Sequence, residues 1–559
     1  MNRRIEVKGL KTLPAVSMSL DDMGWNHTGN WSFFAPVHRD KTSPCAVDCP
    51  VGEPIHQYMH LVTESKYRTA WEMIMAVNPL PAVCGRVCYH PCESRCNRGE
   101  MDEPINIHGM ERFLGDMAIE ERWRISPPKK EIKDSPVVIV GSGPAGLSCA
   151  YHLRLLGYPV TVYERESAPG GMLRVGVPDF RMPRPVLDAE IERLTELGIT
   201  FRCGENITDL EAAASGARAV FLATGAHGSR DPQVTGIERR GVYFGLDFLK
   251  AFNAGGIPEV GRRLAVVGGG NTAIDVARVS RRLGAEVELL YRRTREEMPA
   301  HPEEVEQAQA EGVKFQFQVA PTAVLGKAEQ SPVKGLSMLR MRQGQPDESG
   351  RARPEPVAGS DFQVKADAVV FAIGEAPELE YLNGRGDLAG ERLATDSFGR
   401  TSIPAVFAGG DISPGENTVT HGLADGRAAA RYMHLVLSGI DPATEQVEKQ
   451  EVVEYSQINQ DYFEQGDRRR RTAVSILAQP VNDGHELEET LSPDEARAEA
   501  SRCFNCGSCV HCDNCLIFCP DLAVSCVDGV YKVKKEYCKG CGICAQECPR
   551  YIITMEPKS

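Results

Sequence analysis

Two stretches of the chain share one pattern, in which a short apolar run is followed by a glycine-rich turn and then by an amphipathic segment. The first is VVIVGSGPAGLSCAYHLRLLG (residues 137–157), and the second is LAVVGGGNTAIDVARVSRRLG (residues 264–284). A short β-branched run bounded by glycine predicts a buried parallel strand, and the segment after it predicts a helix. Each stretch is therefore predicted to begin a βαβ unit.

Two further apolar runs predict buried strands that end at glycine, AVFLATGA (residues 219–226) and VFAGGD (residues 406–411). The second run follows the second βαβ unit, so that unit is nested inside the first domain. We predict an α/β fold with two nested dinucleotide-binding, Rossmann-like domains. An N-terminal α-helical domain and a C-terminal α+β domain flank them. The expected domains are 1–130 (helical), 135–258 with 373–445 (first dinucleotide-binding domain), 259–372 (second dinucleotide-binding domain), 446–500 (linker) and 501–559 (C-terminal α+β domain).

Composition and charge exclude several classes of function. With 559 residues, 42% of them hydrophobic and 25% charged, the chain has the composition of a soluble globular protein with several domains. A net charge of −14 argues against nucleic-acid and anionic-membrane partners, and the basic run Arg468 to Arg471 is expected to be a solvated linker. The N-terminus has no apolar leader and no stretch is long and apolar enough to span a bilayer, so we expect a cytoplasmic protein.

The first turn has the spacing of a dinucleotide-binding motif. Gly141, Gly143 and Gly146 form G-x-G-x-x-G between the predicted strand and helix, which allows backbone N–H groups to approach a pyrophosphate. Glu164, at the end of the next strand, is placed to accept hydrogen bonds from an adenosine ribose. A tight turn without a ligand is the alternative. The residues expected to bind this dinucleotide are Gly141, Gly143, Pro144, Ala145, Gly146, Glu164, Gly171 and Gly225.

The second turn indicates a nicotinamide nucleotide. Its motif is G-x-G-x-x-A, and the expected contact residues are Gly268, Gly270, Asn271, Thr272 and Ala273. Tyr291 lies as far after Gly268 as Glu164 lies after Gly141, and it is followed by Arg292 and Arg293. An arginine pair in place of a carboxylate can hold a 2′-phosphate, which favours NADP(H) over NAD(H). Alternatively, the pair is solvated or bonds to the glutamates that follow.

Seventeen of the 19 cysteines lie near the two ends of the chain, which favours metal or cluster ligation over disulfides. Near the C-terminus the run C-x2-C-x2-C-x3-C-P occurs twice, the ligand run of bacterial ferredoxins. Crossed ligation predicts two 4Fe–4S clusters, with two zinc sites as the alternative. The first cluster is expected to use Cys509, Cys512, Cys515 and Cys548, and the second Cys538, Cys541, Cys544 and Cys519. Cys503, Cys506 and Cys526 are left over.

The N-terminal cysteines form a second group, in which Cys45-x3-Cys49 is followed by four cysteines at four-residue intervals, from Cys84 to Cys96. A helical segment separates the two parts. Thiolates without a nearby histidine pair suit iron–sulfur better than zinc, and a four-thiolate zinc site is the alternative.

The segment NPLPAVCGRVCYHPCESRCNRGEMDEPINIHGMERF (residues 78–113) resembles the cluster domain of the glutamate synthase small subunit. Dihydropyrimidine dehydrogenase and the electron-bifurcating NADH-dependent ferredoxin:NADP oxidoreductase share this domain, which holds two 4Fe–4S clusters. The resemblance implies that Cys49, Cys88, Cys92 and Glu111 ligate one cluster. Cys45 and Cys96 match the second, but HRDKTSP (residues 38–44) lacks its two further cysteines, so one or two clusters are expected. Cys84 is a core thiol or a substitute ligand.

The same resemblance implies that the first dinucleotide is FAD. In two-dinucleotide flavoproteins an aspartate at the position of Asp411 hydrogen-bonds FAD, although a helix N-cap is the alternative role. Backbone amides near Thr418 and Val419 are expected to face the flavin N1/C2=O edge. Residues 135–445 contain no C-x-x-C or C-x4-C pair, which argues against a disulfide reductase. No acid–base constellation for an organic substrate is present, so we assign no catalytic residue.

The C-terminal tail resembles the ferredoxin-like delta subunit of pyruvate:ferredoxin and related 2-oxoacid oxidoreductases, through CFNCGSCVHCDNCLIFCPDLAV and YCKGCGICAQECP. We therefore expect an enzyme subunit that exchanges hydride between NAD(P)H and FAD and relays single electrons through 4Fe–4S clusters. The partner would be an oxidoreductase of the 2-oxoacid:acceptor type, or ferredoxin. The alternatives are a glutamate synthase small subunit, a freestanding NAD(P)H:ferredoxin oxidoreductase, and an assembly subunit with structural clusters.

Overall fold

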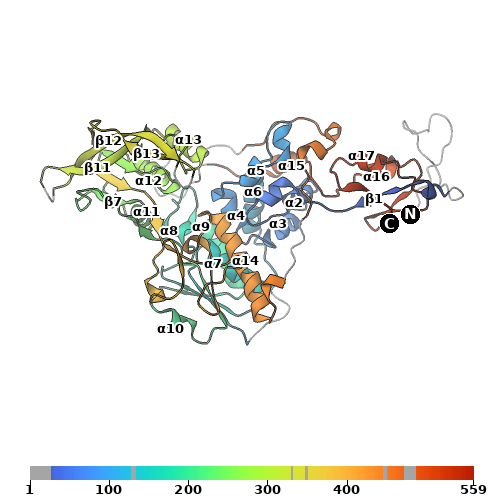
Figure 1. Cartoon of the computed structure of the whole chain (residues 1–559), viewed down its shortest axis with the longest axis horizontal. Helices are drawn as coiled ribbons and strands as arrows, with labels where there is room; N and C mark the ends of the chain where they lie inside the picture. Colours follow the sequence, from blue (N-terminus) through green and yellow to red (C-terminus); the bar gives the residue numbers. More distant parts are fainter. Residues whose placement is uncertain are drawn as a thin grey trace.

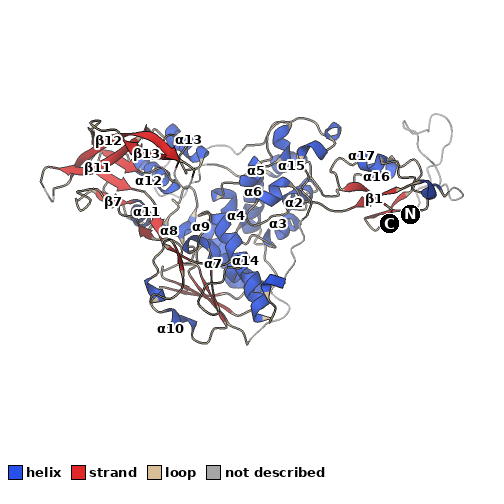
Figure 2. Ribbon diagram, viewed as in Figure 1, coloured by secondary structure: helices blue, strands red, loops and turns tan. Residues whose placement is uncertain are grey.

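The computed structural model describes residues 27–127, 134–328, 331–346, 350–444, 450–470, 486 and 488–558. In Figure 1 the second nucleotide-binding region, with α12, α13 and β11, lies at one end of the molecule. The small region with α16, α17 and β1 lies at the other end, and the N-terminal helices lie between the two. Figure 2 shows that strands dominate the first end and helices the centre. In the described part of the chain no helix combines the length and apolarity that a membrane crossing needs.

The first nucleotide-binding region is a five-stranded parallel sheet. Its strand order is β19-β5-β2-β3-β4. The strands are β2 (Val137–Val140), β3 (Val160–Glu164), β4 (Thr200–Cys203), β5 (Ala219–Leu222) and β19 (Val406–Ala408). Helices α7 (Pro144–Leu155) and α14 (Val419–Leu437) pack against each other. Their close approach requires Gly426, where a Cβ would lie 2.1 Å from the Ala145 carbonyl oxygen. Helices α8 (Met172–Val175), α9 (Arg184–Glu196) and α10 (Leu210–Ala214) complete this region.

The second nucleotide-binding region is also a five-stranded parallel sheet, inserted between β5 and β19. Its order is β10-β9-β8-β15-β7. The elements are β7 (Val242–Phe244), α11 (Gly245–Asn253), β8 (Arg263–Val267), α12 (Asn271–Arg282), β9 (Glu286–Tyr291), α13 (Pro302–Ala310), β10 (Lys314–Phe317) and β15 (Ala368–Phe371). An antiparallel sheet packs on it, made of β11 (Val319–Gly326), β12 (Val333–Pro346), β13 (Ala352–Pro356) and β14 (Phe362–Lys365).

The first boundary of this inserted region differs from the expected one. The prediction placed residues up to 258 with the FAD-binding part, but β7 pairs in parallel with β15, and α11 packs against α12. The inserted region therefore begins near residue 242. The short VYF strand carries no local signal for the sheet that it joins, because its side chains are placed by packing against the hydrophobic cores of the inserted region.

The N-terminal segment is mostly helical, as predicted, and shares one hydrophobic core with the first sheet. Its helices are α1 (Pro44–Asp48), α2 (Ile55–Thr63), α3 (Tyr67–Met75), α4 (Pro81–Val87), α5 (Pro91–Ser94) and α6 (Ile107–Glu120). Helices α4 and α6 approach closely at Gly85, where a Cβ would lie only 2.3 Å from the Arg112 amide nitrogen. This contact brings the C-terminal end of α4 next to the first turns of α6.

The beginning of the described chain does not belong to the helical segment, contrary to the prediction for residues 1–130. Strand β1 (Phe34–His38) pairs antiparallel with β22 (Ile553–Pro557) of the C-terminal region. The other elements of that region are α16 (Asn514–Ile517), β20 (Val524–Val527), β21 (Val530–Val533) and α17 (Ile543–Gln546). The two ends of the described chain therefore build one small region together.

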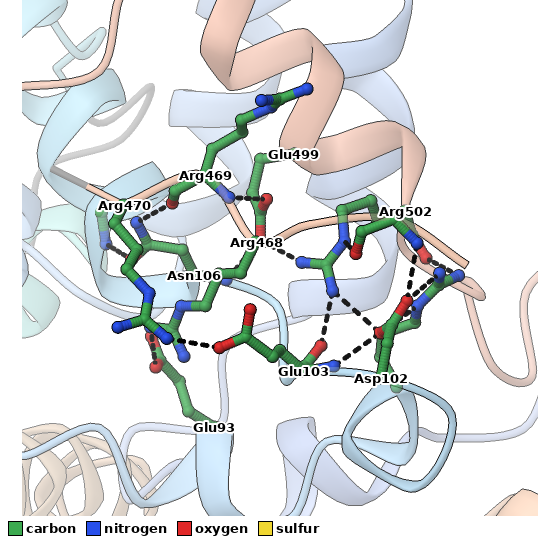
Figure 3. A network of polar contacts seen from close by, with 12 residues as sticks. Glu93, Asp102, Glu103, Asn106, Arg468, Arg469, Arg470, Glu499 and Arg502 are labelled. Atoms are coloured by element: carbon green, nitrogen blue, oxygen red, sulfur yellow. Dashed lines mark hydrogen bonds and ion pairs between the residues drawn. The ribbon is translucent and has the colours of Figure 1, made fainter. Parts of the chain in front are cut away.

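Residues 468–470, expected to be a solvated linker, are bonded to the N-terminal segment and to α15 (Pro493–Ser501), and among them Arg469 and Arg470 are exposed whereas Arg468 is partly buried (Figure 3). Arg468 forms an ion pair with Glu93 at 2.6 Å, and only 17% of its side chain is exposed. The backbone N–H of Arg469 donates to Glu499 at 2.7 Å. Arg470 pairs with Glu103 at 2.5 Å on the surface, and Arg471 lies outside the described residues.

Candidate functional site

A cavity of about 1030 Å³ joins the two nucleotide-binding regions, near the carboxyl ends of their parallel strands. Ligands of open α/β folds bind at this edge of the sheet. Thirteen of the residues expected to contact a dinucleotide line it. These are Gly141, Gly143, Pro144, Ala145, Glu164, Gly171, Gly225, Gly270, Asn271, Thr272, Asp411, Thr418 and Val419.

Both glycine turns leave open space beside their backbone in the cavity wall. A Cβ built on Gly143 or on Gly270 would meet no atom within 4 Å, so each glycine faces open space. Each is the second glycine of its motif, the position where a pyrophosphate approaches the backbone most closely. Gly146 has a different role, because a Cβ there would lie 2.0 Å from the Gly141 carbonyl oxygen. Gly146 therefore allows α7 to pack against its own turn.

Glu164 lies at the expected strand end and its carboxylate is already engaged by the backbone. Its two oxygens accept from the Ser142 amide at 3.0 Å and the Glu166 amide at 2.9 Å. The Ser142 hydroxyl donates to the same carboxylate. These bonds hold the side chain at the cavity wall, where its remaining lone pairs can accept from a ribose.

Asp411 lies in the cavity wall, and the N-cap role that we considered for it belongs to another residue. The Oγ1 atom of Thr418 accepts from the His421 amide at 3.2 Å and caps α14. Asp411 instead lies inside a single 3-10 turn, Gly410–Ile412. Burial raises the pKa of Asp411, and the nearby Arg392 partly offsets this increase. The N-terminal end of α14, with Val419 as its first residue, faces the same cavity.

The residues of the second motif divide into wall and support. Gly270, Asn271 and Thr272 line the cavity at the start of α12, whereas Gly268 and Ala273 lie behind them. The expected arginine pair is also divided. The Nε atom of Arg293, which is only 6% exposed, donates to the Ala352 carbonyl at 2.9 Å, so this side chain is turned into the small antiparallel sheet. Arg292 is exposed at the end of β9.

An ion pair that sequence reasoning missed joins the two regions at the cavity. The Nη1 atom of Arg181 lies 2.8 Å from Asp275 Oδ1 on α12, and Arg181 Nη2 lies 2.7 Å from Glu304. Both Arg181 and Asp275 line the cavity and are almost fully buried. The only signal in the sequence is a carboxylate on the buried face of the helix after the second glycine turn.

The expected ligands of the first N-terminal cluster come together where α1, α4, α5 and α6 meet. Cys49 ends α1, Cys88 ends α4, Cys92 lies on α5 and Glu111 on α6. Burial, followed by the nearby Glu53, raises the pKa of the Cys49 thiol, and Glu111 and Cys88 are close enough to raise it further.

Two polar residues that the sequence did not single out support Glu111. Asn78 donates from Nδ2 to Glu111 at 2.6 Å and to Glu53 at 2.8 Å. Cys84 lies beside them, and its Sγ donates to Asn78 Oδ1 at 3.8 Å. Burial raises the pKa of Glu111, and Glu53 raises it further. Burial thus favours the neutral forms of these carboxyl groups and thiols, and a bound metal would allow them to lose their protons and act as ligands.

This N-terminal group of thiols borders the cavity. Val87 and Tyr89, on either side of Cys88, line the cavity wall. The Cys88 Sγ lies 3.9 Å from the Thr420 hydroxyl oxygen, in the first turn of α14. Cys88 therefore connects the cavity with the cysteine group behind it.

The remaining N-terminal cysteines, Cys45 and Cys96, lie with Cys503 and Cys506 from the other end of the chain. Burial raises the pKa of Cys45, and the neighbouring thiols of Cys96, Cys503 and Cys506 raise it further. The leftover cysteines at 503 and 506 are thus close to Cys45, and the exposed Cys526 is not in this group.

The ferredoxin-like cysteines lie close to one another in the C-terminal region, and the crossed sets stay a prediction. Burial raises the pKa of Cys515 to about 12, and the nearby thiols of Cys548, Cys509 and Cys512 contribute. Burial likewise raises the pKa of Cys544 to about 11, with contributions from Cys538, Cys519 and Cys541. Such thiols become good ligands when a metal displaces the proton.

Comparisons with known proteins agree with this geometry. Residues 135–426 match the model of the pyridine nucleotide-disulphide oxidoreductase family. Residues 39–123 match the model described as dihydropyrimidine dehydrogenase domain II, 4Fe–4S cluster, and residues 531–554 match the 4Fe–4S binding domain.

Three curated relatives span most of the chain. The NADP(+)-dependent formate dehydrogenase subunit beta of Moorella thermoacetica is 39% identical over 83% of this chain and 70% of its own length. The NADPH-Fe(3+) oxidoreductase subunit beta of Geobacter sulfurreducens is 38% identical, over 84% and 76%. The small chain of the NADPH glutamate synthase of Escherichia coli is 36% identical, over 69% and 87%, which confirms the resemblance to that family. The chain belongs to the pyridine nucleotide-disulphide oxidoreductase family and is an NAD(P)H-dependent flavoprotein oxidoreductase with 4Fe–4S domains.

Proposed function

We propose that the chain is the NADPH-linked electron-transfer subunit of a larger oxidoreductase. One observation carries this proposal: a single cavity contains both glycine turns, and Cys88 lies directly behind its wall, 3.9 Å from Thr420. A nicotinamide and a flavin bound at the two turns would meet in this cavity. Electrons leaving the flavin would pass first to the cluster that Cys88 would ligate.

The residues at the first turn fit FAD. The open space at Gly143 suits a pyrophosphate, and Glu164 is held where it can accept from the adenosine ribose. Asp411, which lines the same cavity, would bond the flavin side of the molecule. The N-terminal end of α14 directs its positive dipole toward the cavity, which would stabilise negative charge on the reduced ring.

The residues at the second turn fit NADP(H). Gly270, Asn271 and Thr272 would hold the pyrophosphate at the start of α12. We propose Arg292 as the residue that binds the 2′-phosphate, because Arg293 is bonded to the Ala352 carbonyl. The ion pair of Arg181 with Asp275 would hold the two regions in register while both nucleotides are bound.

Bound FAD supplies the conversion between two-electron and one-electron chemistry. Each cycle would convert one NADPH to NADP+ and one proton and would deliver two electrons to clusters, or would run in reverse. The protein's part is to stack the two rings, exclude water and keep the first cluster close. We assign no acid–base residue to this step, because hydride transfer needs none.

We propose that Cys49, Cys88, Cys92 and Glu111 ligate the cluster next to the cavity. Cys509, Cys512, Cys515 and Cys548 would ligate a second cluster in the C-terminal region, and Cys538, Cys541, Cys544 and Cys519 a third. The ferredoxin spacing and the gathering of each set of thiols support these assignments.

The catalytic partner is proposed to be an oxidoreductase subunit that handles a low-potential substrate. The C-terminal tail favours a 2-oxoacid, whereas the name of the Moorella thermoacetica relative favours formate. Both substrates would deliver electrons to the C-terminal clusters and leave the cavity chemistry unchanged. Affinity isolation from native cells and mass spectrometry of the bound proteins would decide between them, and recovery of a lone chain with full ferredoxin reductase activity would contradict the subunit role.

The experiment that tests the proposed function uses the anaerobically purified chain with its flavin and clusters. We expect NADPH to bleach the flavin and to sustain reduction of an artificial acceptor, with NADH less effective. An unchanged flavin spectrum after NADPH addition would contradict the proposal and favour a purely structural role.

A further inference from the structure

Four cysteines from opposite ends of the chain converge in one buried place. Cys45 belongs to the main hydrophobic core, and Cys96 and Cys503 pack against that same core. Cys506 is 7% exposed, and its Sγ accepts a hydrogen bond at 3.3 Å from Nδ2 of Asn97, the residue after Cys96.

Directional hydrogen bonds hold the two ends of the chain together around these thiols. The Lys41 amide donates to the Gly507 carbonyl at 2.9 Å, and Nδ2 of Asn505 donates to the His56 carbonyl at 2.7 Å. The Gly507 amide donates to the Arg550 carbonyl at 2.9 Å. The segment of residues 503–507 is therefore fixed on the N-terminal helices and is not a loose thiol-bearing loop.

Donors also point at the sulfur atoms, as they do around iron–sulfur clusters. The Asn505 amide donates to Cys503 Sγ at 3.4 Å. Backbone amides of Ile105, Arg98 and Gly99 lie near the Cys96 thiol. Hydrogen bonds to the sulfurs are one of the ways in which a protein tunes a cluster. Thiols that only fill an apolar core need no such donors.

We propose that Cys45, Cys96, Cys503 and Cys506 ligate a further 4Fe–4S cluster. Cys45 and Cys96 match two ligands of the second cluster in the N-terminal family domain. The two further cysteines of that cluster are missing from this part of the chain. The second pair has C-x-x-C spacing and replaces the two upstream cysteines that HRDKTSP lacks. The C-terminal tail thus completes an N-terminal site.

The spacing of the sulfur atoms distinguishes this site from a zinc site. Four thiolates on one tetrahedral zinc ion lie about 3.8 Å apart, because each Zn–S bond is about 2.3 Å long. Within the described parts of the chain, no three cysteine sulfurs all lie within 4.8 Å of one another. The proposed quartet and the two ferredoxin-like sets are therefore all spaced more widely than the four sulfurs of a zinc site.

The quartet lies between the other cluster sites, and its role in the relay rests on the proposed function. Cys45 on α1 lies near Cys92 on α5, which is assigned to the cluster next to the cavity, because these two helices pack against each other. On the other side, Arg550 is close to Cys503 and also to Cys509 and Cys548 of the ferredoxin-like region. A cluster at the quartet would bridge the cavity side and the tail.

The test is an iron count on anaerobically purified full-length protein. With four clusters, the wild type is expected to contain about 16 iron atoms per chain, and the Cys503→Ser/Cys506→Ser variant about 12. The Cys45→Ser/Cys96→Ser variant and the variant with all four substitutions are also expected to contain about 12, because both pairs serve one cluster. Cys526→Ser, which removes an exposed cysteine of the same tail, is the matched control and should leave the iron count unchanged.

Other results would overturn the site. The site would be overturned by an unchanged iron content in the Cys503→Ser/Cys506→Ser variant. It would also be overturned if the iron losses of the two pairs add in the variant with all four substitutions, or if the protein contains one zinc ion in place of four iron atoms. Unchanged FAD content and unchanged NADPH oxidation with an artificial flavin acceptor would show that the variant is folded. If the variant does not fold, Mössbauer spectra of the wild type give the number of clusters, and iron for only three clusters would contradict the proposal.

The relay role is tested separately from the site. In the variant that lacks Cys503 and Cys506, NADPH should still reduce the flavin, while reduction of the C-terminal clusters should slow by about tenfold or more. Wild-type rates in a variant that has lost four irons would contradict the relay role. Failure of NADPH to reduce any cluster in the wild type would instead contradict the proposed function.

Discussion

The Cys88 Sγ lies 3.9 Å from Thr420 Oγ1, although the two residues are 332 positions apart in the sequence. Thr420 belongs to the first turn of α14, which lines the cavity, and Cys88 ends α4 in the cysteine-rich helical segment. Electron transfer between a flavin and a cluster requires this kind of proximity. The contact explains why a cysteine-rich segment shares its hydrophobic core with the first nucleotide-binding sheet.

Replacing Cys88 is predicted to separate flavin chemistry from cluster chemistry. Cys88→Ser should lose about four iron atoms per chain, because one ligand of the cluster next to the cavity is gone. NADPH should still reduce the flavin, since Val87 and Tyr89 line the cavity and the Cys88 sulfur does not. Reduction of the C-terminal clusters, followed by EPR, should fall by about tenfold or more.

Cys203→Ser is the control for this experiment, because Cys203 lies on β4 outside every cysteine group described here. It should retain the wild-type iron content and rates. If Cys88→Ser reduces its tail clusters as fast as the wild type, the path through Cys88 is wrong.

A methyl group on Gly270 should block the nicotinamide nucleotide and leave the fold intact. The Cβ would meet no protein atom within 4 Å, and the φ angle of −90° suits any residue. Gly270→Ala is expected to raise KM for NADPH by about tenfold, the effect of losing about 1.4 kcal/mol of binding. FAD content and thermal stability should not change.

Gly466→Ala is the matched control, since Gly466 also has open space at its Cβ position and does not line the cavity. An unchanged KM in Gly270→Ala would place the nicotinamide nucleotide elsewhere.

Nucleotide preference is predicted to depend on Arg292. In Arg292→Ala, KM for NADPH should rise by about tenfold while KM for NADH stays constant, because only NADPH carries the 2′-phosphate. Steady-state kinetics with both nucleotides provide the measurement. Arg342→Ala removes another exposed arginine of the same region, on β12, and should alter neither constant. Equal increases for both nucleotides in Arg292→Ala would contradict the assignment.

Asp102 is predicted to anchor the segment that wraps the N-terminal helices. Its carboxylate accepts from Arg502 at 2.9 Å and from the Gly466 amide at 3.0 Å. Burial acts to raise the pKa of Asp102, but hydrogen bonds from Arg98 and from the Gly466 and Glu103 amides lower it overall. Asp102→Asn should therefore lower stability by about 1–3 kcal/mol, the usual effect of removing hydrogen bonds to a charged group.

The pH dependence of that loss has a definite sign. A carboxyl group with a lowered pKa stabilises the fold at every pH above its ordinary pKa of about 3.9 and loses this contribution as the pH falls through its folded-state value. The difference in apparent Tm between Asp102→Asn and the wild type should thus be constant from about pH 8 to about pH 5.5. Asp494→Asn, an exposed substitution on α15, is the control. A difference that shrinks within this range would contradict the lowered pKa.

Local patterns predicted the parts of the site that local geometry determines. The strand–turn–helix units at Gly141 and Gly268 are short-range features, since each depends on a few neighbouring residues. Pairing between distant segments was not predictable in this way. Nothing in FAPVH indicates that β1 pairs with β22, because any edge strand of suitable pattern would serve.

The leftover cysteines show the same limit. Cys503 and Cys506 lie just before the first ferredoxin run, and the sequence alone left them over without a role. Their proposed partners, Cys45 and Cys96, come from α1 and from the segment after α5, and only the folded chain brings these thiols together. Arg293 is the opposite case, because its sequence position suggested phosphate binding but its bond to Ala352 turns it away.

The central claim is that electrons from NADPH pass through the flavin to the clusters of this one chain. Anaerobic mixing of the purified chain with NADPH, followed by rapid freezing and EPR, tests it most directly. We predict bleaching of the flavin followed by signals of reduced 4Fe–4S clusters within the time of one turnover. A flavin that is fully reduced while every cluster stays oxidised would contradict the account.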